Sequence, residues 1–185
     1  RIMDYQEALK YSNLSLQIDT YDALANYSSG LVQSALGNIA EAKSAFSIAS
    51  HTMGYRSASY TELAKIYLNE KDLNYTKLYL EKALAFNKYN VHAMEMMALA
   101  FRMEHEPEKA QSLLKKINSL DASSSFLISE QLFLGKIKSE AFKSLITNEL
   151  PFETYLELAM KYKDFGRETE AVEVLKLAPE TPVVL

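Results

Sequence analysis

The stretch from residue 101 to residue 114, FRMEHEPEKAQSLL, comes closer than its neighbours to a catalytic or metal-binding pattern. Glu104, His105 and Glu106 place two carboxylates beside an imidazole, and these groups serve as metal ligands and as general acids or bases. Pro107 follows directly, and a proline at this point equally suits a turn that leads into a helix. The surrounding elements must decide between a site and a turn.

Other residues that could do chemistry are sparse. The chain has no cysteine, which excludes disulfides, thiolate metal sites and a cysteine nucleophile. It contains no G-x-S-x-G, no H-E-x-x-H and no glycine-rich phosphate loop. The paired carboxylates Glu168 and Glu170 are expected on an exposed first turn of a helix. We therefore expect no enzyme activity, no metal site and no cofactor.

Composition favours a helical protein. The 185 residues include only five glycines and four prolines, and 48% are hydrophobic. A net charge of −4 gives no reason to expect a nucleic-acid or membrane partner. No apolar run is long enough to cross a bilayer, and no signal peptide is visible. The compartment stays open, with the cytoplasm slightly favoured over the periplasm. Because the chain starts at Arg1 within an expected helix, we expect it to be part of a longer protein.

Small residues recur every 34 positions along the first two thirds of the chain. One series is Ala8, Ala42, Thr76 and Ala110, and a second is Gly30, Ala64 and Ala98. Large apolar residues follow the first series by four positions, at Phe46, Leu80 and Leu114. Small residues opposite large ones allow two antiparallel helices to approach closely, so each interval predicts a helix–turn–helix unit.

With this period, the chain resembles the tetratricopeptide repeat (TPR) family, whose helix–turn–helix unit has the same length. The matching stretches are NYSSGLVQSALGNIAEAKSAFSIASHTMG, YTELAKIYLNEKDLNYTKLYLEKALAFNK and MEMMALAFRMEHEPEKAQSLLKKI. Asn26, Tyr60 and Met94 stand where the family favours tryptophan, and Thr76 replaces a nearly invariant alanine. In this register His105 falls at the same place as Gly37 and Lys71, in the turn between paired helices.

The register changes in the last third of the chain. The run LELAMKYKDFGRETEAVEVLKLAPETP matches the pattern again, yet the interval from Ala98 to Ala159 is shorter than two regular units. One unit therefore lacks about seven residues of the regular length, with a tight turn expected at Gly135-Lys136. Pro151 is expected to open the next helix.

The resemblance implies an all-α protein, a right-handed TPR α-solenoid of about eleven helices in five and a half repeats. We expect a single array over residues 1–185. Its parts are the second helix of a truncated repeat at 1–22, repeats at 23–56, 57–90 and 91–122, a short atypical repeat at 123–150, and a repeat with the start of the next at 151–185.

The resemblance also implies a scaffold that binds a peptide or helix in a concave groove lined by the first helix of each repeat. The residues at the groove positions are Leu24, Tyr27, Leu31, Thr61, Lys65, Leu68, His92, Glu95, Leu99 and Arg102. This largely apolar set suits a peptide with apolar anchors better than a free carboxylate, which Glu95 would repel. The alternative for each apolar residue is that it packs against a neighbouring helix.

A second hypothesis is a structural spacer that packs against other domains of its own, larger protein. The chain begins half-way through a unit and ends in APETPVVL, which resembles the entry to a further repeat. The run ELPFETYLELAMKYKDFGRETEAVEVLKLAPETP also resembles the TPR segment of large multidomain bacterial proteins with an upstream carbohydrate-associated, β-rich domain. The expected partner is thus a protein or peptide, or another domain of the same chain. Self-association through uncapped ends is also expected.

Overall fold

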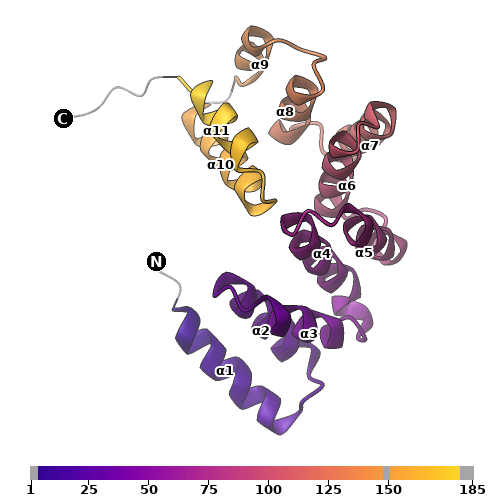
Figure 1. Cartoon of the computed structure of the whole chain (residues 1–185), viewed down its shortest axis with the longest axis vertical. Coiled ribbons are helices and arrows are strands. Elements are labelled where there is room, and N and C mark those ends of the chain that lie inside the picture. Colours follow the sequence, from indigo (N-terminus) through magenta and orange to yellow (C-terminus); the bar gives the residue numbers. More distant parts are fainter. Residues whose placement is uncertain (1–3, 148–150, 180–185) are drawn as a thin grey trace, which may run out of the picture. The chain divides into compact units, whose positions relative to one another are not determined.

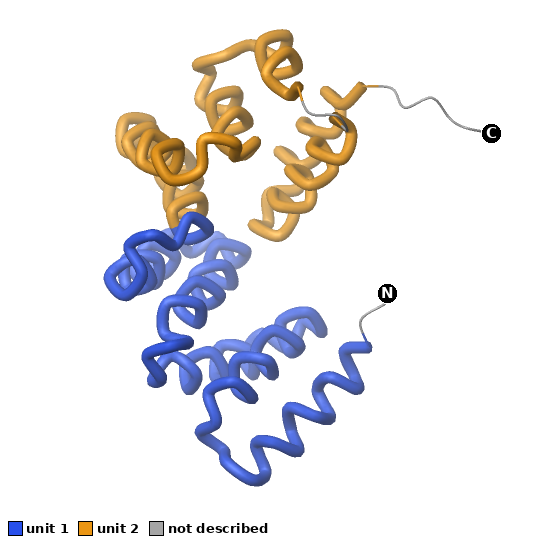
Figure 2. The backbone as a smooth tube through the Cα atoms, turned by 180° about the vertical axis from the view of Figure 1, so that it is seen from behind, with its two compact units in different colours: residues 1–93 blue, residues 94–185 orange. Residues whose placement is uncertain are grey.

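The computed structural model describes residues 4–147 and 151–179, and these ranges contain eleven α-helices (Figure 1). Their bounds are α1 Tyr5–Ile18, α2 Ala23–Ala35, α3 Ile39–Ala49, α4 Met53–Asn69, α5 Leu73–Phe86, α6 Val91–Met103, α7 Pro107–Leu120, α8 Ser125–Phe133, α9 Ser139–Leu145, α10 Pro151–Asp164 and α11 Glu168–Lys176. The prediction of eleven helices is confirmed. The chain divides into two compact units, residues 1–93 (unit 1) and residues 94–185 (unit 2), coloured separately in Figure 2.

The same backbone turn closes five of the helix pairs. In each turn one residue has a left-handed φ between 59° and 82°, and these residues are Gly37, Lys71, His105, Gly135 and Gly166. At His105 the backbone N–H donates to the carbonyl of Arg102, and the next N–H, of Glu106, donates to the carbonyl of Phe101. This pair of bonds is a Schellman motif, which ends a helix by satisfying its last carbonyls. His105 therefore occupies a turn, as the repeat register predicts, and Gly135 lies in the predicted tight turn.

His105→Gly is expected to raise the free energy of unfolding by up to about 1 kcal/mol, because glycine adopts a left-handed φ without the strain of a Cβ. The melting temperature should rise accordingly. Pro107→Ala, at the first position of α7, is expected to have little effect. Thermal unfolding followed by circular dichroism measures both. Zinc that copurifies with the parent and disappears with His105→Gly would contradict the turn assignment.

Unit 1 is built from α1 and the hairpins α2–α3 and α4–α5, whose paired helices contact each other. Its core contains Ala42, Phe46, Leu63 and Ile66, which are at most 4% exposed. A Cβ placed on Gly30 would lie only 2.7–2.9 Å from three atoms of the Phe46 ring. Gly30 and Phe46 thus form the small-and-large pair that the repeating series predicts between α2 and α3.

Gly30→Ala is expected to destabilise the chain by about 1–3 kcal/mol, although alanine is the better helix former. The reason is the overlap with Phe46, whose side chain is fully buried among other core residues. The double variant Gly30→Ala, Phe46→Leu should lose less than the sum of the two single variants, since the smaller side chain removes the overlap. Denaturant unfolding of the four proteins measures this coupling, and additive losses would contradict the close contact.

Unit 2 contains the two shortest intervals between these turns. The interval from the turn at His105 to the turn at Gly135 is shorter than a regular unit, and so is the interval from Gly135 to Gly166. The shortfall is therefore divided between two intervals. Helices α8 and α9 have nine and seven residues, whereas α4 has 17 and α5 has 14. Pro151 begins α10, as predicted. An aromatic core joins α8 to α10, with the Phe133 and Tyr162 ring centroids 5.3 Å apart.

Within the described ranges, no helix combines the length and the apolar character that a membrane crossing requires.

Candidate peptide-binding surface

The apolar part of the predicted groove that remains exposed lies on α2 of unit 1. Leu24, Tyr27 and Leu31 are spaced by three and four residues, which places them on one face of the helix. Leu24 is 59% exposed and Leu31 is 41% exposed. Asp22 caps this helix by accepting a hydrogen bond from the backbone N–H of Ala25. Two large apolar side chains therefore project from a well-defined helix.

Tyr27 joins this face to the interior. Its ring packs edge-on against Phe46, with centroids 5.7 Å apart, and against Tyr55 at 5.5 Å. Burial raises the pKa of Tyr27 above its ordinary value, and the charge of Glu62 raises it further, while Lys65 opposes the shift. Tyr27 is thus a neutral, half-buried aromatic side chain whose position is held by the core.

Helix α4, which contacts α2, adds a charged border. Lys65 Nζ lies 2.9 Å from a carboxylate oxygen of Glu62, one turn away on the same helix. Both side chains are mostly buried, with 18% and 14% of the side chain exposed. The surface that Leu24, Tyr27 and Leu31 form is therefore bordered by a cation and an anion, and we call these five residues the α2–α4 surface.

Other predicted groove residues in unit 1 are engaged in the fold. Thr61 is 4% exposed, donates to the carbonyl of Ser57 and accepts from Asn90 Nδ2 at 3.0 Å. Leu68 is 2% exposed. His92 is half-buried in the first turn of α6. Thr61 and Leu68 thus take the alternative role, packing within the structure.

The predicted residues in unit 2, Glu95, Leu99 and Arg102, are also covered. Glu95 is 3% exposed, and Lys161 of α10 donates to both of its carboxylate oxygens at 2.8 and 2.9 Å. Leu99 is fully buried. Helix α10 of the same unit therefore supplies the partner of Glu95, and no free ligand is needed to pair this carboxylate.

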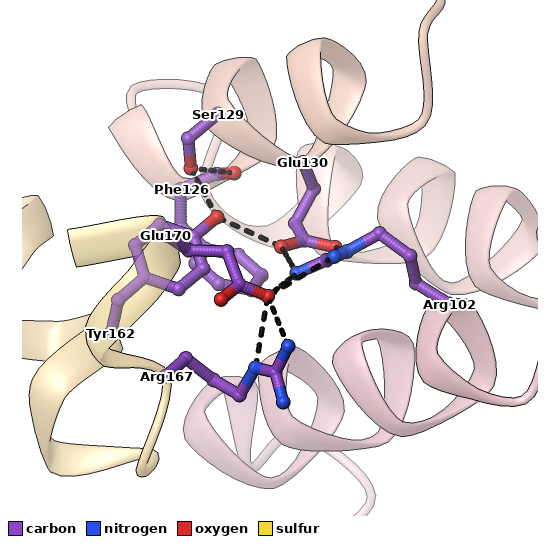
Figure 3. Close-up of polar contacts among 7 residues, drawn as sticks. All are labelled: Arg102, Phe126, Ser129, Glu130, Tyr162, Arg167 and Glu170. Atoms are coloured by element: carbon purple, nitrogen blue, oxygen red, sulfur yellow. Dashed lines mark hydrogen bonds and ion pairs between the residues drawn. The ribbon is translucent and has the colours of Figure 1, made fainter. Parts of the chain in front are cut away.

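Arg102 anchors a buried charge cluster with Glu130, Tyr162, Arg167 and Glu170 (Figure 3). Its guanidinium forms a two-pronged contact with Glu130, at 2.8 Å from Nε and 3.2 Å from Nη2. The same group lies 3.3 Å from Glu170 Oε1, to which Arg167 also donates at 2.7 Å. The Tyr162 hydroxyl donates to Glu130 at 2.8 Å. The cluster ties α6, α8, α10 and α11 together, so its visible role is structural.

The pKa shifts of Arg102 and Tyr162 agree with a structural role of the cluster. Burial acts to lower the pKa of Arg102, but the charge and hydrogen bonds of Glu130 outweigh it and raise the pKa above its usual value. Burial raises the pKa of Tyr162 well above its ordinary range, as does Glu130. Arg102 therefore remains charged and the phenol of Tyr162 stays neutral, so these two groups hold a fixed charge distribution.

The expectation that Glu170 lies on an exposed first turn is wrong. Glu170 is only 5% exposed, because Arg102 and Arg167 converge on one of its oxygens. Sequence reasoning also overlooked Glu130, which is fully buried. A signal was available for Glu130: it interrupts the apolar run SFLISEQLFL, where a charge needs a buried partner.

The stability of the fold is expected to fall on acidification, because Glu170 becomes protonated. Burial acts to raise the pKa of this carboxyl, but hydrogen bonds and charge from Arg167, with the charge of Arg102, lower it below its ordinary value. A lowered folded-state pKa contributes stability above the unfolded-state pKa, and this contribution is lost as the pH falls through the folded-state pKa. Glu170→Gln should cost about 1.5–3 kcal/mol at pH 7. The difference in unfolding free energy between this variant and the parent should shrink below about pH 4.5. Urea unfolding at several pH values measures this difference. A difference that does not change with pH would contradict this role of Glu170.

No group of three or more His, Cys, Asp or Glu side chains suited to hold a metal ion occurs among the residues that the structure describes.

Successive helical hairpins with identical turns and small-on-large packing define the class of helical repeat proteins. No family model matches the sequence, and no curated protein does. Solved structures do match. Two crystal structures of MamA superpose with TM-scores of 0.57 and 0.56 at 16% identity, over 94% of this chain and 86% and 80% of theirs. YrrB, described as a TPR protein with an unusual peptide-binding site, matches with a TM-score of 0.56 at 18% identity, over 94% of this chain and 84% of its own. The chain therefore has the TPR fold, as predicted.

Proposed function

We propose that this chain is a non-catalytic scaffold that binds a protein or peptide partner through the α2–α4 surface. The observation that carries the proposal is the pair Leu24 and Leu31, which are 59% and 41% exposed on a capped helix beside the half-buried Tyr27. Exposed aliphatic side chains next to a fixed aromatic ring offer the kind of anchor contacts that dominate peptide recognition.

The charged border of the α2–α4 surface supports a partner that carries both apolar and polar side chains. Lys65 and Glu62 already pair with each other, so a ligand that approaches them must bring a matched polar group or leave the pair intact. An amphipathic helix or an extended peptide with two apolar side chains meets this requirement. The fold likeness to YrrB, a TPR protein with a peptide-binding site, supports the same class of partner.

A test is selection of peptides from a displayed random library on the whole chain, followed by affinity measurements with the selected peptides. The variant Leu24→Asp, Leu31→Asp should weaken their binding by about tenfold or more, because two carboxylates replace the apolar anchors. Both residues are exposed, so the variant should fold. Leu99 is unsuitable for such a change, since it is fully buried.

A matched control is Met53→Asp, Leu78→Asp, which introduces the same charges at two exposed apolar positions of unit 1 outside the α2–α4 surface. The control should bind within about twofold of the parent. If no peptide is selected, or if both variants lose binding equally, the α2–α4 surface is not the binding site. The structural spacer hypothesis, with contacts to neighbouring domains, would then be preferred.

A further inference from the structure

Unit 2 contains a pocket of about 300 Å³ that the proposed function does not use. Its walls come from α7, α8, the α8–α9 turn and α9. The buried side chains Leu114 and Leu127 form part of its lining, together with Ile128 and Ile137. Leu145 of α9 also lines the pocket and is 51% exposed. The interior of this pocket is therefore largely aliphatic.

The pocket has a physical origin in the short repeat. Helix α9 has only seven residues, half the length of α5 and α7, which hold the equivalent place in their own hairpins. A second helix of full length would extend past Leu145 and cover more of α8. The short helix leaves Ile128 of α8 half-buried at a recess that Leu114 and Leu127 also line, and a recess is the usual form of a small-ligand or side-chain binding site.

Polar groups from α7 and α8 also line the recess. Lys115, Asn118 and Gln131 complete its lining, and they offer an ammonium group and two side-chain amides. Amides can pair with the N–H and C=O groups of an extended peptide backbone, and the lysine can pair with a carboxylate.

The segment of chain that supplies the pocket lining carries more lysines than carboxylates, in contrast to the whole chain. Residues 111–147 contain five exposed lysines, Lys115, Lys116, Lys136, Lys138 and Lys143. The carboxylates of this segment are Asp121, Glu130 and Glu140, and Glu130 is buried against Arg102. Lys136 and Lys138 directly flank the pocket residue Ile137. Lys115 in the lining, with Lys136 and Lys138 next to it in sequence at Ile137, favours a negatively charged ligand even though the chain has a net charge of −4.

We propose that this pocket is a second binding site, which takes an acidic peptide segment through one large aliphatic or aromatic side chain. The apolar side chain fills the recess between α7, α8 and α9. Carboxylates on either side of it pair with Lys115, Lys136 and Lys138, and the peptide backbone bonds with Asn118 and Gln131. This site is separate from the α2–α4 surface.

The probe is a pair of fluorescein-labelled octapeptides with equal numbers of Asp and Glu, which carry either Leu or Ala at the centre. Fluorescence anisotropy with the whole chain should give a Kd below about 1 mM for the Leu peptide and binding at least about fivefold weaker for the Ala peptide. Leu145→Asp and Lys115→Glu should each weaken the Leu peptide by about tenfold or more. Methyl resonances of Ile128 and Ile137 should shift on titration.

Matched controls separate this site from general charge attraction and from the α2–α4 surface. Leu175→Asp and Lys176→Glu make the same changes at exposed positions of α11 and should stay within about twofold of the parent. Leu24→Asp, Leu31→Asp should also retain the acidic peptide, whatever its effect on library peptides. Circular dichroism verifies that each variant folds.

Three results would overturn the proposal. They are an absence of binding at about 1 mM, equal losses in the pocket variants and the α11 controls, and binding of decanoate in place of the peptides. The last result would show that the pocket takes a small hydrophobic carboxylate instead of a peptide.

Discussion

Arg102→Ala is expected to destabilise the chain by about 3–5 kcal/mol, the largest loss from any single charge change. The substitution removes the cation that contacts both Glu130 and Glu170, which are fully buried and 5% exposed. Two carboxylates would then remain away from water with fewer partners, and the cost of an unpaired buried charge exceeds the net value of the pair. Amide hydrogen exchange should show the greatest loss of protection in α8, α10 and α11, because the cluster connects these helices to α6.

A matched control for Arg102 is Lys109→Ala. Lys109 pairs with Glu106 at 2.8 Å, but its side chain is 61% exposed, so the loss should be below about 1 kcal/mol. Adding Glu130→Gln to Arg102→Ala should recover part of the stability, because it removes one unpaired charge. Urea unfolding followed by circular dichroism compares the four proteins. Equal losses for Arg102→Ala and Lys109→Ala would show that the cluster is not energetically important.

Ala42→Glu is expected to lower stability by about 3 kcal/mol or more. Ala42 has no exposed surface and belongs to the core cluster with Phe46, Leu63 and Ile66. A glutamate there brings a longer side chain and a charge into the contact of α3 with its neighbours, where this cluster supplies no cation. The side chain must either displace the core or remain buried and unpaired.

The control for Ala42 is Ala40→Glu, two residues earlier in α3 and exposed. This change adds the same group on the solvent side and should alter stability by less than about 0.5 kcal/mol. Thermal unfolding compares both variants with the parent. A melting temperature for Ala42→Glu within about two degrees of the parent would contradict the register of the repeats.

Much of the fold follows from local rules. The turns at Gly37, Lys71 and His105 recur at the period of the repeat. Each turn could be predicted from the sequence because a Schellman motif uses hydrogen bonds that join residues only three and five positions apart. The pairing of Gly30 with Phe46 is likewise visible in the sequence, since the two helices of a hairpin are adjacent along the chain. The total shortfall before Ala159 was also predictable, but its division between two intervals was not.

The candidate site depended far more on tertiary structure. Leu31 and Leu99 occupy the same position in the repeat register, and so do Tyr27 and Glu95. Yet Leu31 is 41% exposed while Leu99 is fully buried, and Tyr27 is half-buried while Glu95 is only 3% exposed. Register identifies the face of a helix, whereas burial depends on which distant helix covers that face. In unit 2, α10 brings Lys161 to Glu95 across 66 residues of sequence.

By itself, the sequence determined the all-α repeat class, the hairpin turns and the small-on-large contacts within hairpins, because these depend on short-range hydrogen bonds and on periodic side-chain volume. Only the tertiary structure decided that Arg102 is the centre of a buried charge cluster and that Glu170 is inside it. Their contact spans 68 residues. It also revealed the largely aliphatic pocket beside the short α9. Contacts at such separations depend on the lengths and packing of all the helices that lie between the two residues, and a local sequence pattern does not determine these together.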